Sequence, residues 1–223
     1  MKKLSFFLVA LLSLGAAHAW ATPVTLTFTG LQDQEPINNY YNGGTGGLGS
    51  SGGTNYGIAF SSNSLAIISV LNGGSGNFSN VPAPATDTIA FFLNGSGDVM
   101  NVAAGFDTGF SFYYAATSQQ GSVDVYSGLN GSGTLLATLV LPANGSYCGT
   151  EAYSCWSETG VAFAGSAQSV VFGGAANYIG FADITLGSDV VPPTNPIPEP
   201  SSLLLLGTGA MAAAGGLRRR IKA

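Results

Sequence analysis

Apolar and polar residues alternate along short stretches in the middle of the chain, and clusters of Gly, Asn and Ser separate these stretches. The alternation is clearest at residues 110–114 and 123–126. A period of two residues is typical of a β-strand with one buried and one wetter face. The pattern predicts strands at 24–29, 57–61, 65–71, 88–93, 109–115, 122–127, 134–141, 160–164, 169–172 and 178–186. No amphipathic helical period stands out, so the chain is predicted to be all-β.

Many short strands with frequent turn residues favour two packed sheets over a single open one. We therefore expect one β-sandwich, jelly-roll-like, over residues 22–190. The pairs Asn94-Gly95, Asn130-Gly131 and Asn144-Gly145 are predicted hairpin turns, because Asn and Gly both tolerate positive φ.

The two ends of the chain are apolar and differ from this body. Residues 1–21 have two lysines, an apolar run and small-residue triplets, which together are typical of a secretory signal peptide. We expect cleavage after Ala21, with Ala19 as the alternative. Export of the body to an oxidising compartment follows from this segment.

The C-terminal end combines a Pro-rich linker at 191–200 with an uncharged apolar run and a basic cluster at 201–223. The run is near the lower limit of about 17 residues for a membrane-spanning helix. Positive charges at the end of such a helix stay cytoplasmic, which leaves the body outside the membrane. Both ends therefore predict the same topology.

Charge is distributed unevenly along the chain. All six Lys and Arg residues lie at the two ends, and the eleven acidic residues lie between them. A body without cationic side chains cannot neutralise phosphates, so we expect no nucleic-acid partner. The body also lacks His, which removes imidazole bases, catalytic triads, Schiff-base lysines and arginine clamps.

Only a glycosidase with paired carboxylates remains chemically open to this body as an enzyme. Its candidate acids are Asp33, Glu35, Glu151 and Glu158. Nothing in the sequence places two of them at the required separation, so we expect a protein that is not an enzyme and assign no catalytic residues.

The two cysteines, Cys148 and Cys155, lie close together in a protein that is predicted to be exported. An even count in an oxidising compartment favours one disulfide. A zinc site is excluded, because the body has no histidine and no further cysteine to complete it.

The C-terminal residues resemble the PEP-CTERM sorting signal. The motif Pro198-Glu199-Pro200 is followed by Leu203 to Leu206 and then by Arg218, Arg219 and Arg220. The resemblance implies a Gram-negative host that makes extracellular polysaccharide. It also implies a membrane processing enzyme, exosortase, as a partner, with the body at the cell envelope, at the cell surface or outside the cell.

The first and last strands of the body resemble those of galactose-binding-like jelly rolls. The resemblance lies in residues 28–36, 40–41, 56–60 and 178–186. It implies a structural calcium near the meeting point of these strands, for which Asp33, Glu35 and Asp183 are the candidate ligands. The alternative makes these three residues ordinary turn and edge acids.

The same resemblance raises carbohydrate binding, which needs exposed aromatic rings with polar groups beside them. Tyr40, Tyr41, Tyr153 and Trp156 lie in predicted loops and are the candidates. The alternative is that they cover the core or the disulfide. Two functions stay open: a structural surface or matrix protein that accompanies exopolysaccharide in a biofilm, and a carbohydrate-binding module with or without calcium.

Overall fold

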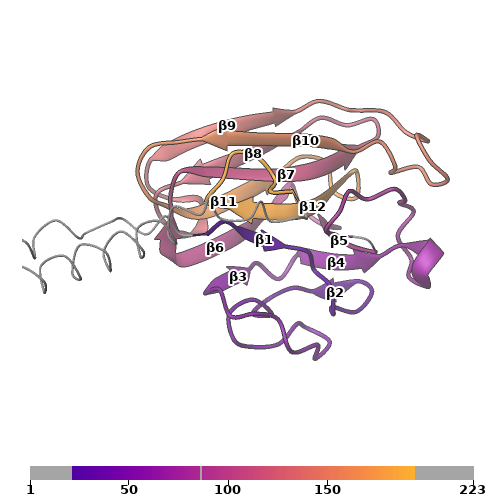
Figure 1. The fold of residues 1–223 in the computed structure, drawn as a ribbon, viewed down its shortest axis with the longest axis horizontal. Helices are drawn as coiled ribbons and strands as arrows, with labels where there is room; N and C mark the ends of the chain where they lie inside the picture. The colour runs from indigo at the N-terminus through magenta and orange to yellow at the C-terminus, as the bar shows by residue number, and fades with distance from the viewer. Residues whose placement is uncertain (1–21, 86, 194–223) are drawn as a thin grey trace, which may run out of the picture. The chain divides into compact units, whose positions relative to one another are not determined.

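The computed structural model describes residues 22–85 and 87–193, which form a sandwich of two antiparallel sheets (Figure 1). This confirms the predicted all-β, jelly-roll-like fold. The strands are β1 (Val24–Leu26), β2 (Glu35–Pro36), β3 (Ile58–Phe60), β4 (Ser64–Ile68), β5 (Thr88–Phe92), β6 (Gly97–Phe106), β7 (Gly109–Ala116), β8 (Gly121–Tyr126), β9 (Leu135–Leu141), β10 (Ser157–Ala162), β11 (Ala167–Gly173) and β12 (Ile179–Leu186). Short 3-10 helices η1 (Val70–Asn72) and η2 (Leu129–Gly131) interrupt two connections.

The larger sheet has seven strands in the order β10-β7-β12-β5-β4-β2, with β1 paired to β12 outside this path. The smaller sheet has five strands in the order β3-β6-β11-β8-β9. Strand β12 is the last of the strands in residues 22–193 and pairs with β1, β5 and β7, so the large sheet joins residues from both ends of the body.

The core between the sheets is filled by phenylalanine rings. On β7, Phe110 and Phe112 are fully buried and point inward, as the alternating pattern predicts. They contact Phe172 of β11 and Phe181 of β12, whose ring centroids are 4.9 Å apart at an interplanar angle of 64°. Such edge-to-face pairs add about 0.5–1.5 kcal/mol each to the effect of burying the area.

The ten predicted strands are all present with shifted ends, and the sequence pattern missed β2 and β6. Strand β6 carries Gly97, Asp98 and Asn101 among its apolar residues, which hid its alternation. Asp98 points inward with Met100 and Val102 and is 5% exposed. The buried face of this strand therefore includes a carboxyl group, which a hydrophobic pattern cannot reveal.

Two of the three predicted hairpin turns join strands that do not pair. Asn130-Gly131 lies between β8 and β9, which are antiparallel partners, so that prediction is correct. Asn94-Gly95 and Asn144-Gly145 instead lie on connections that cross from one sheet to the other. The Asn144 side chain donates to the Tyr114 carbonyl at 3.1 Å, so it fastens a crossover to the large sheet.

The predicted signal peptide at 1–21 and the predicted membrane helix and basic tail at 201–223 lie outside the described residues. Most of the predicted linker at 191–200 does as well. Within the described part of the chain, no helix has the length and apolarity to cross a membrane.

Candidate functional site

The outer face of the large sheet is covered by two long connections. One joins β4 to β5 and the other joins β9 to β10. Phe78 and Ala85 of the first connection pack against Ile89 and Ala182 of the sheet, and together they form a second buried apolar cluster. Both faces of β12 are thereby buried, and its core-facing residues change phase between Phe181 and Ile184, where the pairing with β7 shifts register.

The two covering connections are bound to each other through their backbones. The Tyr153 amide donates to the Asn77 carbonyl at 3.1 Å, and the Ser79 amide donates to the Tyr153 carbonyl at 3.3 Å. The Trp156 indole N–H adds a bond of 2.9 Å to the Ser79 carbonyl, and its ring meets that of Phe78 edge-on. This places Tyr153 at the seam of the two connections.

The predicted disulfide between Cys148 and Cys155 is present, with the Cα atoms 5.1 Å apart. It closes the loop that carries Tyr153. Inside the loop, the Ser154 hydroxyl accepts from the Gly149 amide at 2.8 Å and donates to the Glu151 carbonyl at 2.7 Å. The covalent link and these bonds hold the backbone around Tyr153 in one conformation.

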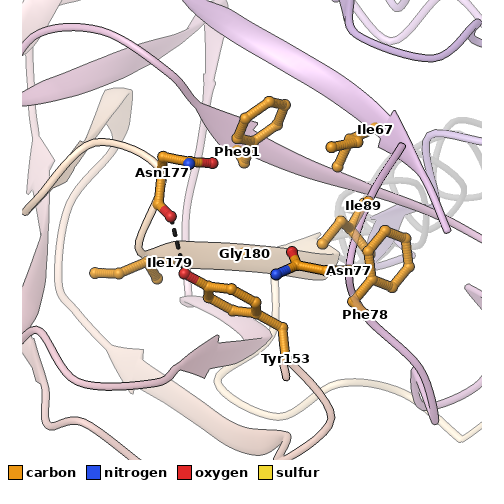
Figure 2. Close-up of a pocket in the computed structure, with 10 residues that line it drawn as sticks. Ile67, Asn77, Phe78, Ile89, Phe91, Tyr153, Asn177, Ile179 and Gly180 are labelled. Carbon is orange, nitrogen blue, oxygen red and sulfur yellow. Dashed lines mark hydrogen bonds between the residues drawn. The ribbon is translucent and has the colours of Figure 1, made fainter. Parts of the chain in front are cut away.

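A shallow hollow of about 30 Å³, open to solvent, lies beside this seam (Figure 2). The Tyr153 ring forms one wall, and its hydroxyl donates to the Asn177 carbonyl at 2.8 Å. The amide side chains of Asn77 and Asn177 border the hollow and are exposed to solvent. The complete lining is Ile67, Gly76, Asn77, Phe78, Ile89, Phe91, Tyr153, Asn177, Ile179 and Gly180.

No charged side chain lines the hollow. Its floor is open because residue 180 is a glycine. Gly180 lies on β12, where an added Cβ would come within 2.7 Å of the Ile89 side chain. A larger residue at this position would displace Ile89 and fill the floor. The site therefore offers an aromatic wall, an apolar floor and two amides, a combination that suits a neutral polar ligand.

Of the four aromatic residues predicted to bind carbohydrate, only Tyr153 borders this hollow. Trp156 is partly buried and holds the covering connections together. Tyr40 and Tyr41 are 4% and 6% exposed and belong to the main core, so the prediction of exposed rings at these positions is wrong. Their hydroxyls explain the placement: Tyr40 donates to the Thr29 carbonyl and Tyr41 accepts from the Phe28 amide.

The predicted calcium ligands are not brought together. Asp33 accepts from the Ile68 amide at 2.9 Å, and Asp183 accepts from the Ala85 amide at 2.9 Å. Glu35 is fully buried and accepts three backbone N–H groups. Within residues 22–85 and 87–193, no group of three acidic, His or Cys side chains is arranged to hold a metal ion. Calcium binding stays a prediction from the sequence resemblance.

Two carboxyl groups are buried with an oxygen that lacks a partner among the described residues, Oδ1 of Asp98 and Oδ2 of Asp183. Burial raises the pKa of each to about 7, although a hydrogen bond with Ser64 opposes this for Asp98 and one from the Ala85 amide for Asp183. Neither Asp98 nor Asp183 lines the hollow, and neither do the glycosidase candidates Asp33, Glu35, Glu151 and Glu158.

A second hollow, of about 360 Å³, lies where β1, β3 and β6 come together. Val24, Ile58, Val102 and Phe106 give it an apolar lining. Thr22 also borders it, and Thr22 is the first residue that the structure describes. We therefore base the candidate site on the hollow beside Tyr153, all of whose walls are well inside the described chain.

Comparison with known families places one motif on the chain. Residues 196–220 match the PEP-CTERM protein-sorting motif, which includes Pro198, Glu199, Pro200 and Arg218 to Arg220. This confirms the predicted sorting motif. Such signals mark exported proteins of Gram-negative bacteria, so the body is that of an exported protein. A search of curated proteins finds none that matches the chain.

Solved structures with a similar fold include two carbohydrate-binding modules and an adhesin domain. A family 6 carbohydrate-binding module of Cellvibrio mixtus lichenase 5A, in complex with cellotriose, is 15% identical, with 57% of this chain and 88% of that one covered and a TM-score of 0.36. The K1 cleaved adhesin domain of Lys-gingipain from Porphyromonas gingivalis is 14% identical, with coverages of 58% and 96% and a TM-score of 0.34. The C-terminal family 6 module of LamC from Zobellia galactanivorans is 16% identical, with coverages of 56% and 98% and a TM-score of 0.31.

Sequence reasoning missed the two amides of the site. Asn77 and Asn177 are a hundred residues apart, and only the packing of the covering connections brings them beside Tyr153. One partial signal for Asn177 was present in the sequence, an Asn directly before the predicted strand 178–186. The structure places this residue at positive φ. Asn is common at such positions for conformational reasons alone, so the signal did not indicate binding.

Proposed function

We propose that this exported protein binds polysaccharide at the cell surface through the hollow beside Tyr153. The observation that carries the proposal is the Tyr153 ring, held at the seam of two covering connections and flanked by the exposed amides of Asn77 and Asn177. An aromatic ring packs against the apolar face of a sugar, and amides bond to its hydroxyls.

The charge of the site favours a neutral sugar unit. The hollow has no acid or base in its lining, and the body has no Lys or Arg to attract an anionic polymer. Its volume of about 30 Å³ is far below the range of about 300–1,000 Å³ for pockets that enclose a ligand, so a sugar would rest against the Tyr153 ring at the surface rather than be buried. We infer a site for a single neutral sugar unit, within a chain or at its end, with an affinity in the weak range that suits many contacts along a polymer.

The test compares two tyrosines that belong to the same stretch of chain. Tyr153→Ala removes the wall of the hollow, whereas Tyr147→Ala removes a ring that is 70% exposed and outside it. The full chain in mild detergent is titrated with the host's exopolysaccharide and screened on a glycan array, with calcium and with chelator. We expect a loss of about tenfold or more in affinity for Tyr153→Ala, equivalent to about 1.4 kcal/mol, and no change for Tyr147→Ala.

Tyr153→Phe keeps the ring and removes the bond to the Asn177 carbonyl, so it should retain most of the binding. Equal affinity in all three variants, or no binding to any glycan, would refute the proposal. Absence of binding would favour the alternative, a structural surface protein retained by sorting alone. The titration in chelator tests the predicted calcium separately. Loss of binding in chelator would support a calcium ion that is required for sugar binding.

A further inference from the structure

The last strand of the small sheet, β9, has an unpaired edge. It pairs with β8 and with no other strand in the described part of the chain. Its seven residues are apolar except Thr138, and they include no charge, proline or glycine. An edge of this kind presents free N–H and C=O groups along its length and is a template for pairing with another strand.

The other outer strands carry the features that normally prevent such pairing. Strand β2 is two residues long and ends in Pro36, and β3 is three residues long. Strand β10 carries a charge at Glu158 and a glycine at Gly160. Short length, charge and proline all protect sheet edges. In β9 the one irregularity is a register shift at its first residues, and residues 137–141 pair regularly with β8.

Side chains on both faces of β9 are only partly covered. Leu135 and Val140 are 50% and 58% exposed on the outer face. Leu136, Ala137 and Leu139 pack against the core but stay half-buried, because no neighbouring strand covers them on the free side. A strand added at this edge would cover these groups and would pair the free backbone groups at the same time.

The sequence of β9 is suited to a second copy of itself. Thr138 lies at its centre, and the residues on either side are similar when read towards it. Leu135, Leu136 and Ala137 come before Thr138, and Leu141, Val140 and Leu139 come after it. Antiparallel pairing about Thr138 places Ala137 opposite Leu139, both of which face the core side. On the core face beside the central Thr138–Thr138 pair, apolar side chains therefore meet apolar side chains, which a partner strand of unrelated sequence would not ensure.

Charge repulsion between two copies is small at this edge, although each body is acidic. The nearest acid is Asp124 of β8, which accepts a hydrogen bond from Thr138 at 2.7 Å. In a paired sheet the two Asp124 residues would be three strand spacings apart, about 14 Å. This exceeds the Debye length of about 8 Å at physiological salt, so their repulsion is largely screened.

We propose that two copies of this chain pair antiparallel through β9, which joins their small sheets into one continuous sheet across a two-fold axis. The contact uses the same strand of both copies, so it closes after two copies and does not propagate. The opposite edge of the small sheet, β3, is too short to continue it. The pairing is independent of the sugar site, since the hollow lies on the large sheet.

The test places a positive charge on the edge. Val140→Lys and Leu135→Lys introduce lysine at exposed positions of β9, and Leu48→Lys introduces it at a residue that is 58% exposed elsewhere. The full chains, in the same detergent, are measured by sedimentation velocity from about 1 to 100 μM. All variants carry the same apolar tail, so association through the tail affects each of them equally. Near-ultraviolet circular dichroism confirms folding.

We expect a dimer that dissociates on dilution for the natural chain and for Leu48→Lys. We expect at least a tenfold weaker dimer for each β9 variant, and slower hydrogen exchange of residues 137–141 in the natural dimer than in the monomer. A natural chain that stays monomeric at 100 μM would overturn the proposal, and so would a dimer that both β9 variants preserve.

Discussion

Two buried carboxyl groups of this body, Glu35 and Asp183, have opposite surroundings. Both are 0% exposed. Glu35 accepts backbone N–H groups from Gln32 at 2.7 Å, Leu48 at 2.8 Å and Ser50 at 3.0 Å. Asp183 has one such bond, from Ala85, and its second oxygen has no partner among the described residues. Burial alone therefore does not determine the state of an acid in this protein.

The difference appears in the pKa values. Burial raises the pKa of Glu35, but the bonds from Gln32, Ser50 and Leu48 outweigh this effect and hold the pKa below its ordinary value. At Asp183 burial prevails and raises the pKa to about 7. With no Lys or Arg in the body, backbone amides are the main groups left to stabilise a buried negative charge. The Gly-rich loop at 43–53 supplies two of the three amides that bind Glu35, and the covering connection supplies only one to Asp183.

The largest expected effect concerns pH. Asp183 and Asp98 both have a pKa raised from 3.8 to about 7, so between these values the folded chain binds more protons than the unfolded one. Its free energy of unfolding therefore falls as pH rises from about 4 to 7, by up to about 4 kcal/mol for each group. The lowered pKa values of Glu35 and Asp33 act in the opposite sense, below about pH 4.5. Stability should be greatest near pH 4 to 5.

Urea unfolding across pH 3 to 9 measures this profile, and Asp183→Asn serves as its probe. The variant should match the natural chain within about 1 kcal/mol at pH 4 and exceed it in stability above pH 7, because it carries no charge to bury. Asp98→Asn should do the same for the other group. If the free energy of unfolding of the natural chain rose from pH 4 to 7, Oδ1 of Asp98 and Oδ2 of Asp183 would have hydrogen-bond partners in solution.

The next effect comes from Glu35. Glu35→Gln places an amide N–H₂ where the carboxylate accepts from backbone N–H groups, so at least one buried donor loses its acceptor. We expect a loss of about 3 kcal/mol in the free energy of unfolding at pH 6, because hydrogen bonds to a buried charge are the strong ones. Glu158→Gln is the matched control, since Glu158 is exposed and accepts one amide, from Val191.

A change below about 0.5 kcal/mol is expected for that control. If Glu35→Gln proved equally mild, the Gly-rich loop would depend on something other than the buried carboxylate. Limited proteolysis of the loop at 43–53 would then locate the difference.

The smallest effect is expected at Ser111, which lies on β7 opposite Thr185 of β12. Its hydroxyl is buried without a partner in the described structure. Ser111→Ala removes an unsatisfied group and leaves little space, so stability should change by less than about 1 kcal/mol and in the favourable direction. Thermal unfolding at pH 5 checks this. A clear loss of stability would show that the hydroxyl is bonded through a water molecule.

Much of the fold could be predicted from the sequence, because it depends on local alternation. The inward phenylalanines of β7 and the strand ends at Asn and Gly are visible in the pattern alone. Strand β6 was missed where Asp98 occupies an inward position, and the connections that cover the outer face of β12 were not predicted. Both failures have the same cause, which is that the pattern cannot show what packs on a strand from elsewhere in the chain.

The candidate site was less predictable. Tyr153 was identified because it lies in a predicted loop, and the disulfide followed from an even count of cysteines in a protein predicted to be exported. Tyr40 and Tyr41 looked equivalent to it, yet their hydroxyls find backbone partners inside the core. Asn77 and Asn177 could be identified only from the structure. An Asn in the sequence does not indicate a binding site by itself, and here the indication is the Tyr153 ring beside both amides.

The position of β12 also determines when this protein can fold. The strand is central in the large sheet and is delivered last, and Thr25 of β1 bonds to Thr185 across 160 residues of chain. An exported chain emerges from its N-terminal end, so β1, β5 and β7 reach the far side of the membrane before the strand that joins them. Until then the large sheet lacks its centre and apolar strands stay uncovered. Because β12 comes shortly before the sorting motif at residues 196–220, we expect the large sheet to be completed only when nearly the whole chain has been exported.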